Sequence, residues 1–349
     1  MVAAAAVVGS GFTLHADAGP HHGGKHYTEW SEPVNMGAPI NSEFHESGAK
    51  LTRQGRSLYF ASNRPCGADD AVLDFNIWVA RRKHVHAEWE APECLHINAN
   101  ARTEGEMPWS DREPELSDDG HWLLFSSDRP GSLPEGQLIP AGGDIWASWR
   151  HDVRDDQGWS EPFRVPGLDT EFSERGPQYF ERDRGHYLLG GRHGLPQLYF
   201  STTRSGFLDL WVVSLLHGTV WGAPEPVTEV NTELVEAGGV LSPDGREMYI
   251  FRGDPRPQVG IDLDLYVARR PHLNAPWSDP VSLGEPLNSP GNDQEPTLSD
   301  DGRLLIFASN RDGSMLLPNG VPSLDLWIVK RQPGKAGPRP WLWPWPWWR

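Results

Sequence analysis

The chain has 349 residues and carries 31 Lys and Arg against 48 Asp and Glu, a formal net charge of −17. This excess of acids argues against nucleic acid or an anionic membrane surface as a general partner. Cys66 and Cys94 are the two cysteines, which excludes a disulfide-rich scaffold and leaves open one disulfide or two thiols.

The first 18 residues resemble a secretory signal. An apolar run over residues 2–18 ends in Ala16-Asp17-Ala18, which has the form of a cleavage site. The usual basic segment before such a run is missing, so a truncated signal peptide and a plain Ala-rich leader are both open. We expect residues 1–18 to direct export to the periplasm or the exterior, and residues 19–29 to form a flexible linker.

Five segments share one plan, in which a Trp is followed three residues later by Pro and then by apolar residues. Their first residues are Trp30, Trp89, Trp159, Trp221 and Trp277, at separations of 59, 70, 62 and 56 residues. A period that stays near 60 residues predicts a repeated supersecondary unit.

Each unit contains three more strand signals. In the last unit they are EPTLS, closed by a turn at Asp300-Asp301-Gly302, then RLLIFAS, then LDLWIVKR. Four strands per unit, with few helical patterns, predict an all-β fold that is a five-bladed β-propeller over residues 30–331. Because the last unit lacks its fourth strand, the strand at residues 30–42 is expected to complete the last blade and close the ring.

Nine of the 17 tryptophans recur once per blade, which predicts packing between sheets rather than sugar stacking. They are Trp78, Trp146, Trp211 and Trp327 in third strands and the five that open the segments above.

The pattern EPxLSxDGxxLxFxSxR followed by DIWV and a Trp-Pro strand resembles the TolB-type, WD-like β-propeller repeat. Residues 112–129 and 294–311 match it closely, whereas Gly48-Ala49 and Gly238-Gly239 replace Glu-Pro in two other units. The resemblance covers residues 30–331 and implies an interaction platform of the bacterial envelope, although such propellers are also appended to hydrolases.

Every unit has a carboxylate at the start of its innermost strand, and this ring is the main candidate site. Its members are Glu46, Asp111, Glu174, Glu236 and Asp293. Carboxylates around one axis repel unless a cation or a basic ligand lies among them, which suggests Ca²⁺ in the channel. The alternative is structural: each acid accepts hydrogen bonds within its own blade. No cofactor is required by any motif.

Three more residues are candidate binding residues on the same face. Glu113 and Glu295 follow the ring acids by two positions, and Trp109 lies in an expanded loop. Long loops at residues 130–143 and 312–324 place Leu138, Ile139, Met315, Leu316 and Leu317 at the rim, where they either bind a protein or peptide or pack on neighbouring loops.

These features predict a monomeric, exported, non-catalytic platform that binds a protein, a peptide or a glycan through the acidic face. The alternative is a glycoside hydrolase of five-bladed type with Asp111, Glu174 and Asp293 as acid and base. A structural envelope protein with an idle channel is a third class. Residues 332–349 form a Trp/Pro-rich tail that suggests membrane contact, docking onto the propeller or disorder.

Overall fold

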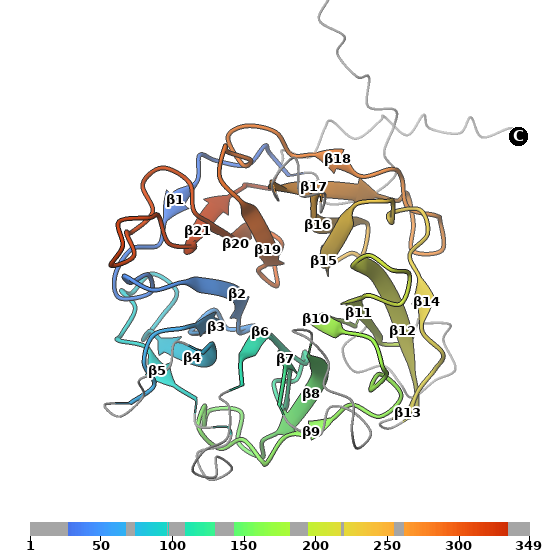
Figure 1. Ribbon diagram of the computed structural model, residues 1–349, viewed down its shortest axis with the longest axis horizontal. Coiled ribbons are helices and arrows are strands. Elements are labelled where there is room, and N and C mark those ends of the chain that lie inside the picture. Colours follow the sequence, from blue (N-terminus) through green and yellow to red (C-terminus); the bar gives the residue numbers. More distant parts are fainter. Residues whose placement is uncertain are drawn as a thin grey trace, which may run out of the picture.

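The computed structural model describes residues 27–67, 74–95, 97, 109–129, 143–181, 195–217, 220–254 and 262–333. The chain forms a ring of five antiparallel sheets around a central axis (Figure 1). The predicted five-bladed β-propeller is therefore confirmed. The proposed signal peptide, most of the linker and nearly all of the Trp/Pro-rich tail lie outside the described residues.

Each blade begins with its innermost strand and ends at the outer edge of the ring (Figure 1). Blade 1 contains β2 (Glu46–Leu51), β3 (Ser57–Ser62), β4 (Asn76–Arg81) and β5 (Glu93–Cys94). Blade 2 contains β6 (Asp111–Leu116), β7 (Trp122–Ser127), β8 (Asp144–Trp149) and β9 (Phe163–Arg164). Blade 3 contains β10 (Glu174–Phe180), β11 (Gln197–Thr202), β12 (Asp209–His217), β13 (Val220–Trp221) and β14 (Glu225–Pro226). Blade 4 contains β15 (Val235–Leu241), β16 (Glu247–Gly253), β17 (Leu263–Arg269) and β18 (Val281–Ser282), and blade 5 contains β19 (Asp293–Leu298), β20 (Leu304–Ser309) and β21 (Asp325–Lys330).

The fourth strand of blade 5 comes from the start of the chain, as predicted. β1 (Val34–Asn35) pairs with β21, with Val34 opposite Ile328. We call this contact between β1 and β21 the seam. Backbone hydrogen bonds extend it, because Ser31 N donates to Lys330 O at 2.8 Å and Thr28 N donates to Gln332 O at 2.8 Å. The ring therefore closes by hydrogen bonds between residues near opposite ends of the sequence.

The second strands supply the centre of each blade because their apolar residues are buried on both faces. Phe60, Phe125, Phe200 and Phe307 are each 0 % exposed, and clusters of apolar side chains join each blade to the next. The tryptophans of the third strands line these contacts; Trp78 and Trp327, for example, are 8 % and 7 % exposed. These positions act as packing residues, as their recurrence predicts.

A bulge interrupts the innermost strand of every blade. The register with the second strand shifts between Ser47 and Lys50 in blade 1 and at the equivalent place in the other four blades. A bulge leaves residues unpaired and redirects their side chains, and it is common next to functional sites. The bulged residues are the ones nearest the axis, so they decide which side chains enter the channel.

Cys66 and Cys94 form a disulfide, which settles the alternative left open by the sequence. It links the segment after β3 to β5 in blade 1, with a Cα–Cα distance of 5.6 Å. In the described part of the chain, no helix has the length and apolar character needed to span a membrane.

Candidate functional site

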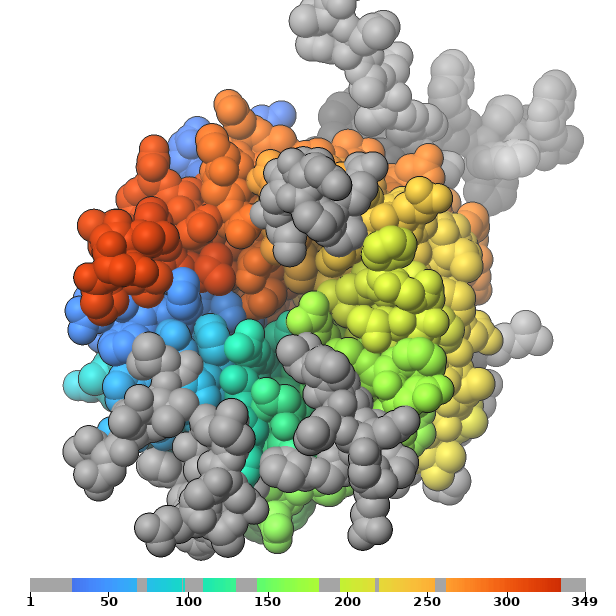
Figure 2. Space-filling model, viewed as in Figure 1, coloured from blue at the N-terminus to red at the C-terminus, as the bar shows by residue number. Residues whose placement is uncertain are grey.

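We call the face that carries the connections from fourth to first strands the upper face, and the face with the turns between first and second strands the lower face. Figure 2 shows the five sectors of the ring meeting at the centre, with the loop between β20 and β21 in red-orange at the rim. The ring acids lie at the upper ends of the innermost strands, where the sequence predicted them.

The five ring acids do not meet around the axis, because each is buried in its own blade against an arginine. All five are at most 7 % exposed. The nitrogen–oxygen distances are 2.7 Å for Arg64–Glu46, 2.5 Å for Arg129–Asp111, 3.1 Å for Arg204–Glu174, 2.8 Å for Arg252–Glu236 and 2.5 Å for Arg311–Asp293. Charge-assisted pairs of this kind brace the loops that leave each blade.

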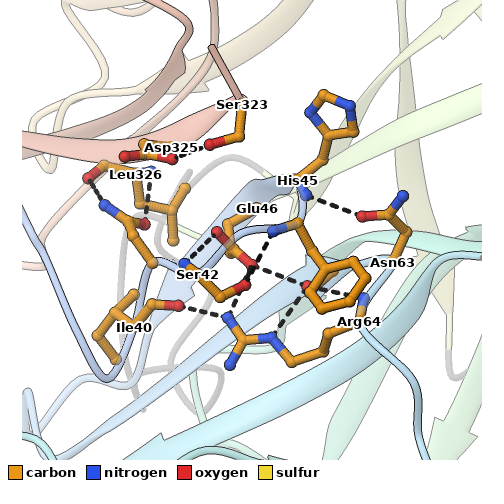
Figure 3. Close-up of polar contacts among 12 residues, drawn as sticks. Ile40, Ser42, His45, Glu46, Asn63, Arg64, Ser323, Asp325 and Leu326 are labelled. Carbon is orange, nitrogen blue, oxygen red and sulfur yellow. Dashed lines mark hydrogen bonds and ion pairs between the residues drawn. The ribbon is translucent and has the colours of Figure 1, made fainter. Parts of the chain in front are cut away.

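Blade 1 shows the arrangement (Figure 3). Ser42 donates to Glu46 through its backbone N at 2.9 Å and its hydroxyl at 2.6 Å, and Arg64 Nη2 donates at 2.7 Å. Arg64 Nη2 also donates to the carbonyl of Ile40, so the acid and its arginine hold the incoming loop against the blade. Burial raises the pKa of Glu46, and the nearby Arg64 charge opposes that rise.

This geometry favours the structural alternative for the ring acids. Ser289 and Arg311 engage both oxygens of Asp293, and Arg129 engages both oxygens of Asp111. Among the described residues, no group of three His, Cys, Asp or Glu side chains is placed to hold a metal ion. The ring as built does not fit Ca²⁺, since each carboxylate already has a cationic partner.

The structure also changes the role expected for Trp109, and blade 4 departs from the other blades in the origin of its arginine. Trp109 is 6 % exposed and packs near Arg129, with the guanidinium 5.8 Å from the ring centroid, so it braces blade 2 and is not open to a ligand. In four blades the arginine is the second residue after the second strand, a sequence position that Pro255 occupies in blade 4. Arg252 fills the role from a position directly opposite Glu236 in the sheet.

Glu113 and Glu295 are the candidate residues that do reach the axis. Each is the third residue of its innermost strand and takes a positive φ, +54° for Glu113 and +51° for Glu295. They are the two non-glycine residues with positive φ in the described chain, and the equivalent positions in the other blades are Gly48, Gly176 and Gly238. A left-handed backbone costs a side-chain-bearing residue free energy, and such strain is concentrated at functional sites.

Both glutamates lie next to Gly48, Glu113 through its backbone and Glu295 through its carboxyl group. A Cβ atom placed on Gly48 would lie 2.9 Å from the Cα of Glu113 and 3.4 Å from Oε2 of Glu295. A cavity of about 20 Å³ is lined by both glutamates and by Gly48, Gly176 and Gly238. This volume holds roughly one water molecule.

The surroundings of the two carboxyl groups differ. Glu113 Oε2 accepts hydrogen bonds from the Ser126 hydroxyl at 2.6 Å and from Gly176 N at 2.8 Å. Glu295 Oε1 accepts a longer one from Gln294 Nε2 at 3.3 Å, and Glu295 Oε2 has no hydrogen-bond partner among the described residues. Burial and then the charge of Glu113 raise the pKa of Glu295 to about 7, against the opposing effect of Ser47 and of two arginines.

Those two arginines lie at the mouth of the channel. Arg112 and Arg175 precede the bulge in blades 2 and 3 and are exposed. The Arg112 guanidinium is 4.0 Å from the centroid of the Phe75 ring. The upper mouth therefore combines two half-buried glutamates with two exposed cations.

A second arginine column on the lower face has no counterpart in the sequence predictions. Its members donate from Nε to the carbonyl of a turn glycine and stack on a fourth-strand tryptophan; they are Arg82 with Gly55 and Trp89, Arg150 with Gly120 and Trp159, Arg270 with Gly245 and Trp277, and Arg331 with Gly302 and Trp30. The Arg that ends the third-strand motif in four of the five blades was the available signal.

No family model matches the chain, and no curated protein matches it. Solved structures do share the fold. The structure of a BT0996 RGII complex has a TM-score of 0.55 and 12 % identity, covering 90 % of this protein and 94 % of that one. A thermostable family-43 glycoside hydrolase has a TM-score of 0.52 and 14 % identity over 87 % and 97 %, and an α-L-arabinofuranosidase from Lactobacillus brevis has 0.50 and 12 % over 88 % and 98 %.

These comparisons correct two expectations. The resemblance to TolB-type repeat proteins is wrong, because the structures that share this fold include five-bladed glycoside hydrolases and no family model supports the repeat. The non-catalytic interaction platform that was inferred from that resemblance is overturned with it. At 12 to 14 % identity the likeness concerns the fold, so the chemistry has to be argued from the residues of this chain.

Proposed function

We propose that the chain is a glycoside hydrolase whose reacting carboxyl groups are Glu113 and Glu295. The observation that carries the proposal is the pair of strained, axis-facing glutamates at positions where the other three blades have glycine. Glycoside hydrolysis uses two carboxyl groups held in different environments, one as acid and the other as base or nucleophile. The fold likeness to two glycoside hydrolases supports the same class.

The different surroundings suggest the role of each residue. Glu295, whose pKa is raised to about 7, can donate its proton to the oxygen of the departing sugar. Glu113 accepts two hydrogen bonds, which hold its carboxyl group in place to take a proton from water. The resulting hydroxyl adds to the anomeric carbon as the bond to the leaving oxygen breaks, and the cavity beside the pair has room for that water.

The acids Asp111, Glu174 and Asp293 serve this reaction poorly. Each is buried, and each binds the arginine of its own blade, so a sugar could not reach it without breaking that pair. Recurrence in all five blades also gives them similar surroundings, whereas acid and base need different ones.

The substrate would be a glycan outside the cytoplasm. The Cys66–Cys94 disulfide supports an oxidising compartment, which agrees with export as inferred from the leader. Arg112 and Arg175 at the mouth would donate hydrogen bonds to hydroxyl or carboxylate groups of the sugar.

The test is a screen of the full chain against 4-nitrophenyl glycosides, arabinofuranosides included, and against plant and microbial polysaccharides. Once a substrate is found, Glu113→Gln and Glu295→Gln should each lower kcat/KM by about 10²- to 10⁴-fold, the usual contribution of acid–base catalysis. Glu32→Gln, an exposed glutamate near the seam, is the charge-matched control and should keep full activity.

Two further readouts separate the roles. Activity should fall as pH rises above about 7 because Glu295 loses its proton there. Glu295→Gln should remove this dependence, and it should lose less activity on 4-nitrophenyl substrates, whose leaving group needs little protonation, than on polysaccharides. Wild-type activity in both glutamine variants would refute the assignment.

A further inference from the structure

The lower mouth of the channel contains a pocket that the proposed hydrolysis does not use. Its volume is about 640 Å³, within the range of sites for small ligands, and its walls come from the first–second strand turns of several blades. The pocket extends from the axis, at Lys50 and Gln178, to the loops after β4 and β8. It opens on the face opposite Glu113 and Glu295.

Basic residues outnumber acidic residues in the lining of this pocket, unlike in the whole chain. Seven of its lining residues are basic and five are acidic, although acids outnumber bases 48 to 31 in the sequence. The basic residues are Lys50, Arg53, Arg56, Arg81, Arg82, Arg150 and Arg154.

Four of these cations are already neutralised by acids. Lys50 binds Glu115 at 2.6 Å, and Arg154 binds Asp152 at 2.9 Å. Asp156 is shared by the other two, with Arg81 at 2.8 Å and Arg150 at 2.7 Å. These four residues build the walls and are not available to a ligand.

The other three arginines surround the turn between β2 and β3. Arg53 is 51 % exposed and makes one long contact, 3.4 Å to Asp300. Arg56 is exposed, and in the described chain no acidic group pairs with it or with Arg82. Arg82 is fixed by the Gly55 carbonyl and the Trp89 ring, and burial alone lowers its pKa.

Arg82 differs from the arginines at the same position in two other blades. Arg150 is paired with Asp156, and Arg331 is paired with Glu247 at 2.9 Å. Arg82 is held as rigidly by its glycine carbonyl and tryptophan but lacks the acid. A guanidinium fixed in this way is prepared for two-point binding of a carboxylate or phosphate at little cost in conformational entropy.

We propose that the lower pocket is a second binding site, which holds the carboxylate or phosphate group of a small anionic ligand between Arg53, Arg56 and Arg82. The size of the pocket admits a ligand as large as a disaccharide acid. The site is separate from the hydrolytic pair, because neither Glu113 nor Glu295 lines the pocket.

The test measures binding by isothermal titration calorimetry with the full chain and three probes: digalacturonate, its neutral galactose counterpart, and inorganic phosphate. Digalacturonate or phosphate should bind, more weakly as salt is raised, and the neutral disaccharide should not. Tighter binding of digalacturonate would identify a sugar acid as the source of the anion, and tighter binding of phosphate would identify a phosphate group.

Arg53→Gln/Arg56→Gln should weaken that binding by about tenfold or more, and Arg82→Gln should do the same if the variant stays folded. Arg246→Gln is the matched control, since Arg246 follows the turn glycine of blade 4 as Arg56 does in blade 1 but does not line the pocket. Glu295→Gln should bind normally, so failure of the hydrolytic proposal would leave this one standing. Equal binding of the neutral disaccharide, unchanged binding in the Arg53/Arg56 variant, or no binding of either anion up to about millimolar concentration would overturn it.

Discussion

The buried acid–arginine pairs are the residues that hold the upper face in place. Arg311 binds Asp293 and also donates to the carbonyl of Pro286 at 3.0 Å, so one guanidinium joins a strand to the loop that enters it. Its ring contacts are with Phe307 and Trp327, at 4.9 and 5.3 Å from their centroids. Because these pairs repeat around the ring, the upper loops are braced five times over.

Removing one partner of a buried acid–arginine pair should lower the stability of the protein. Asp293→Ala leaves the Arg311 charge buried and unpaired, and we expect a loss of about 3 to 5 kcal/mol in the free energy of unfolding. Urea unfolding monitored by tryptophan fluorescence measures it. Asp312→Ala, in the adjacent exposed loop, is the control and should change stability by less than about 0.5 kcal/mol. A similar small change for Asp293→Ala would show that water reaches the pair.

The sequence located these acids but not their partners. The repeat placed Glu46, Asp111 and their counterparts correctly at the starts of the innermost strands. Their direction depends on the bulge that follows, and a periodic pattern does not show which way a side chain points from an irregular backbone. Glu113 and Glu295, which stand where the other three blades have glycine, carried more information than the ring acids that all five blades share.

At the scale of single elements, the bulge in the innermost strand affects both the packing of the blades and the position of the proposed catalytic glutamates. Gly48 lets the backbone of blade 1 approach Glu113 of blade 2, and its φ of +54° is itself disfavoured for other residues. The same bulge turns Glu113 and Glu295 toward the axis. One irregularity therefore provides both the close packing at the centre and the position of the two carboxyl groups beside the axis.

Gly48→Ala tests this double role. Its Cβ would lie 2.9 Å from the Cα of Glu113, so the variant should lose more stability than the φ strain alone explains, and activity should fall because Glu113 is displaced. Gly37→Ala isolates the strain, since Gly37 has a φ of +62° and nothing within 4 Å of the added atom. We expect about 1 to 2 kcal/mol for Gly37→Ala and a larger loss for Gly48→Ala. Equal losses, measured by thermal unfolding, would contradict the close approach.

The strands themselves could be predicted well, because their signals are local. Apolar runs such as RLLIFAS and the Asp-Asp-Gly turn fix a strand and its end without reference to the rest of the chain. The lower pocket could not be predicted, because Arg53, Arg82 and Arg150 come from different strands and turns and meet only when the blades are packed.

At the scale of the whole molecule, closure of the ring depends on a short seam. Without β1, the edge of β21 would be exposed, and exposed strand edges pair with other chains. A chain that lacks residues 1–35 should therefore unfold at lower temperature and form dimers or larger species. Size-exclusion chromatography and thermal unfolding measure both effects, with a chain lacking residues 1–26 as the control for shortening. A stable monomer without β1 would mean that the blade contacts alone hold the ring.

The seam also sets the order in which the propeller can be made. β1 is synthesised before every other described strand, and its partner β21 comes after all of them. During synthesis β1 must therefore wait without a partner while about 290 residues follow it. Folding cannot be completed from one end of the ring to the other, and the final step joins its two ends in one event. Any delay late in synthesis would thus prolong the exposure of β1. The risk of misassembly therefore depends more on the time needed to complete the ring than on the stability of any single blade.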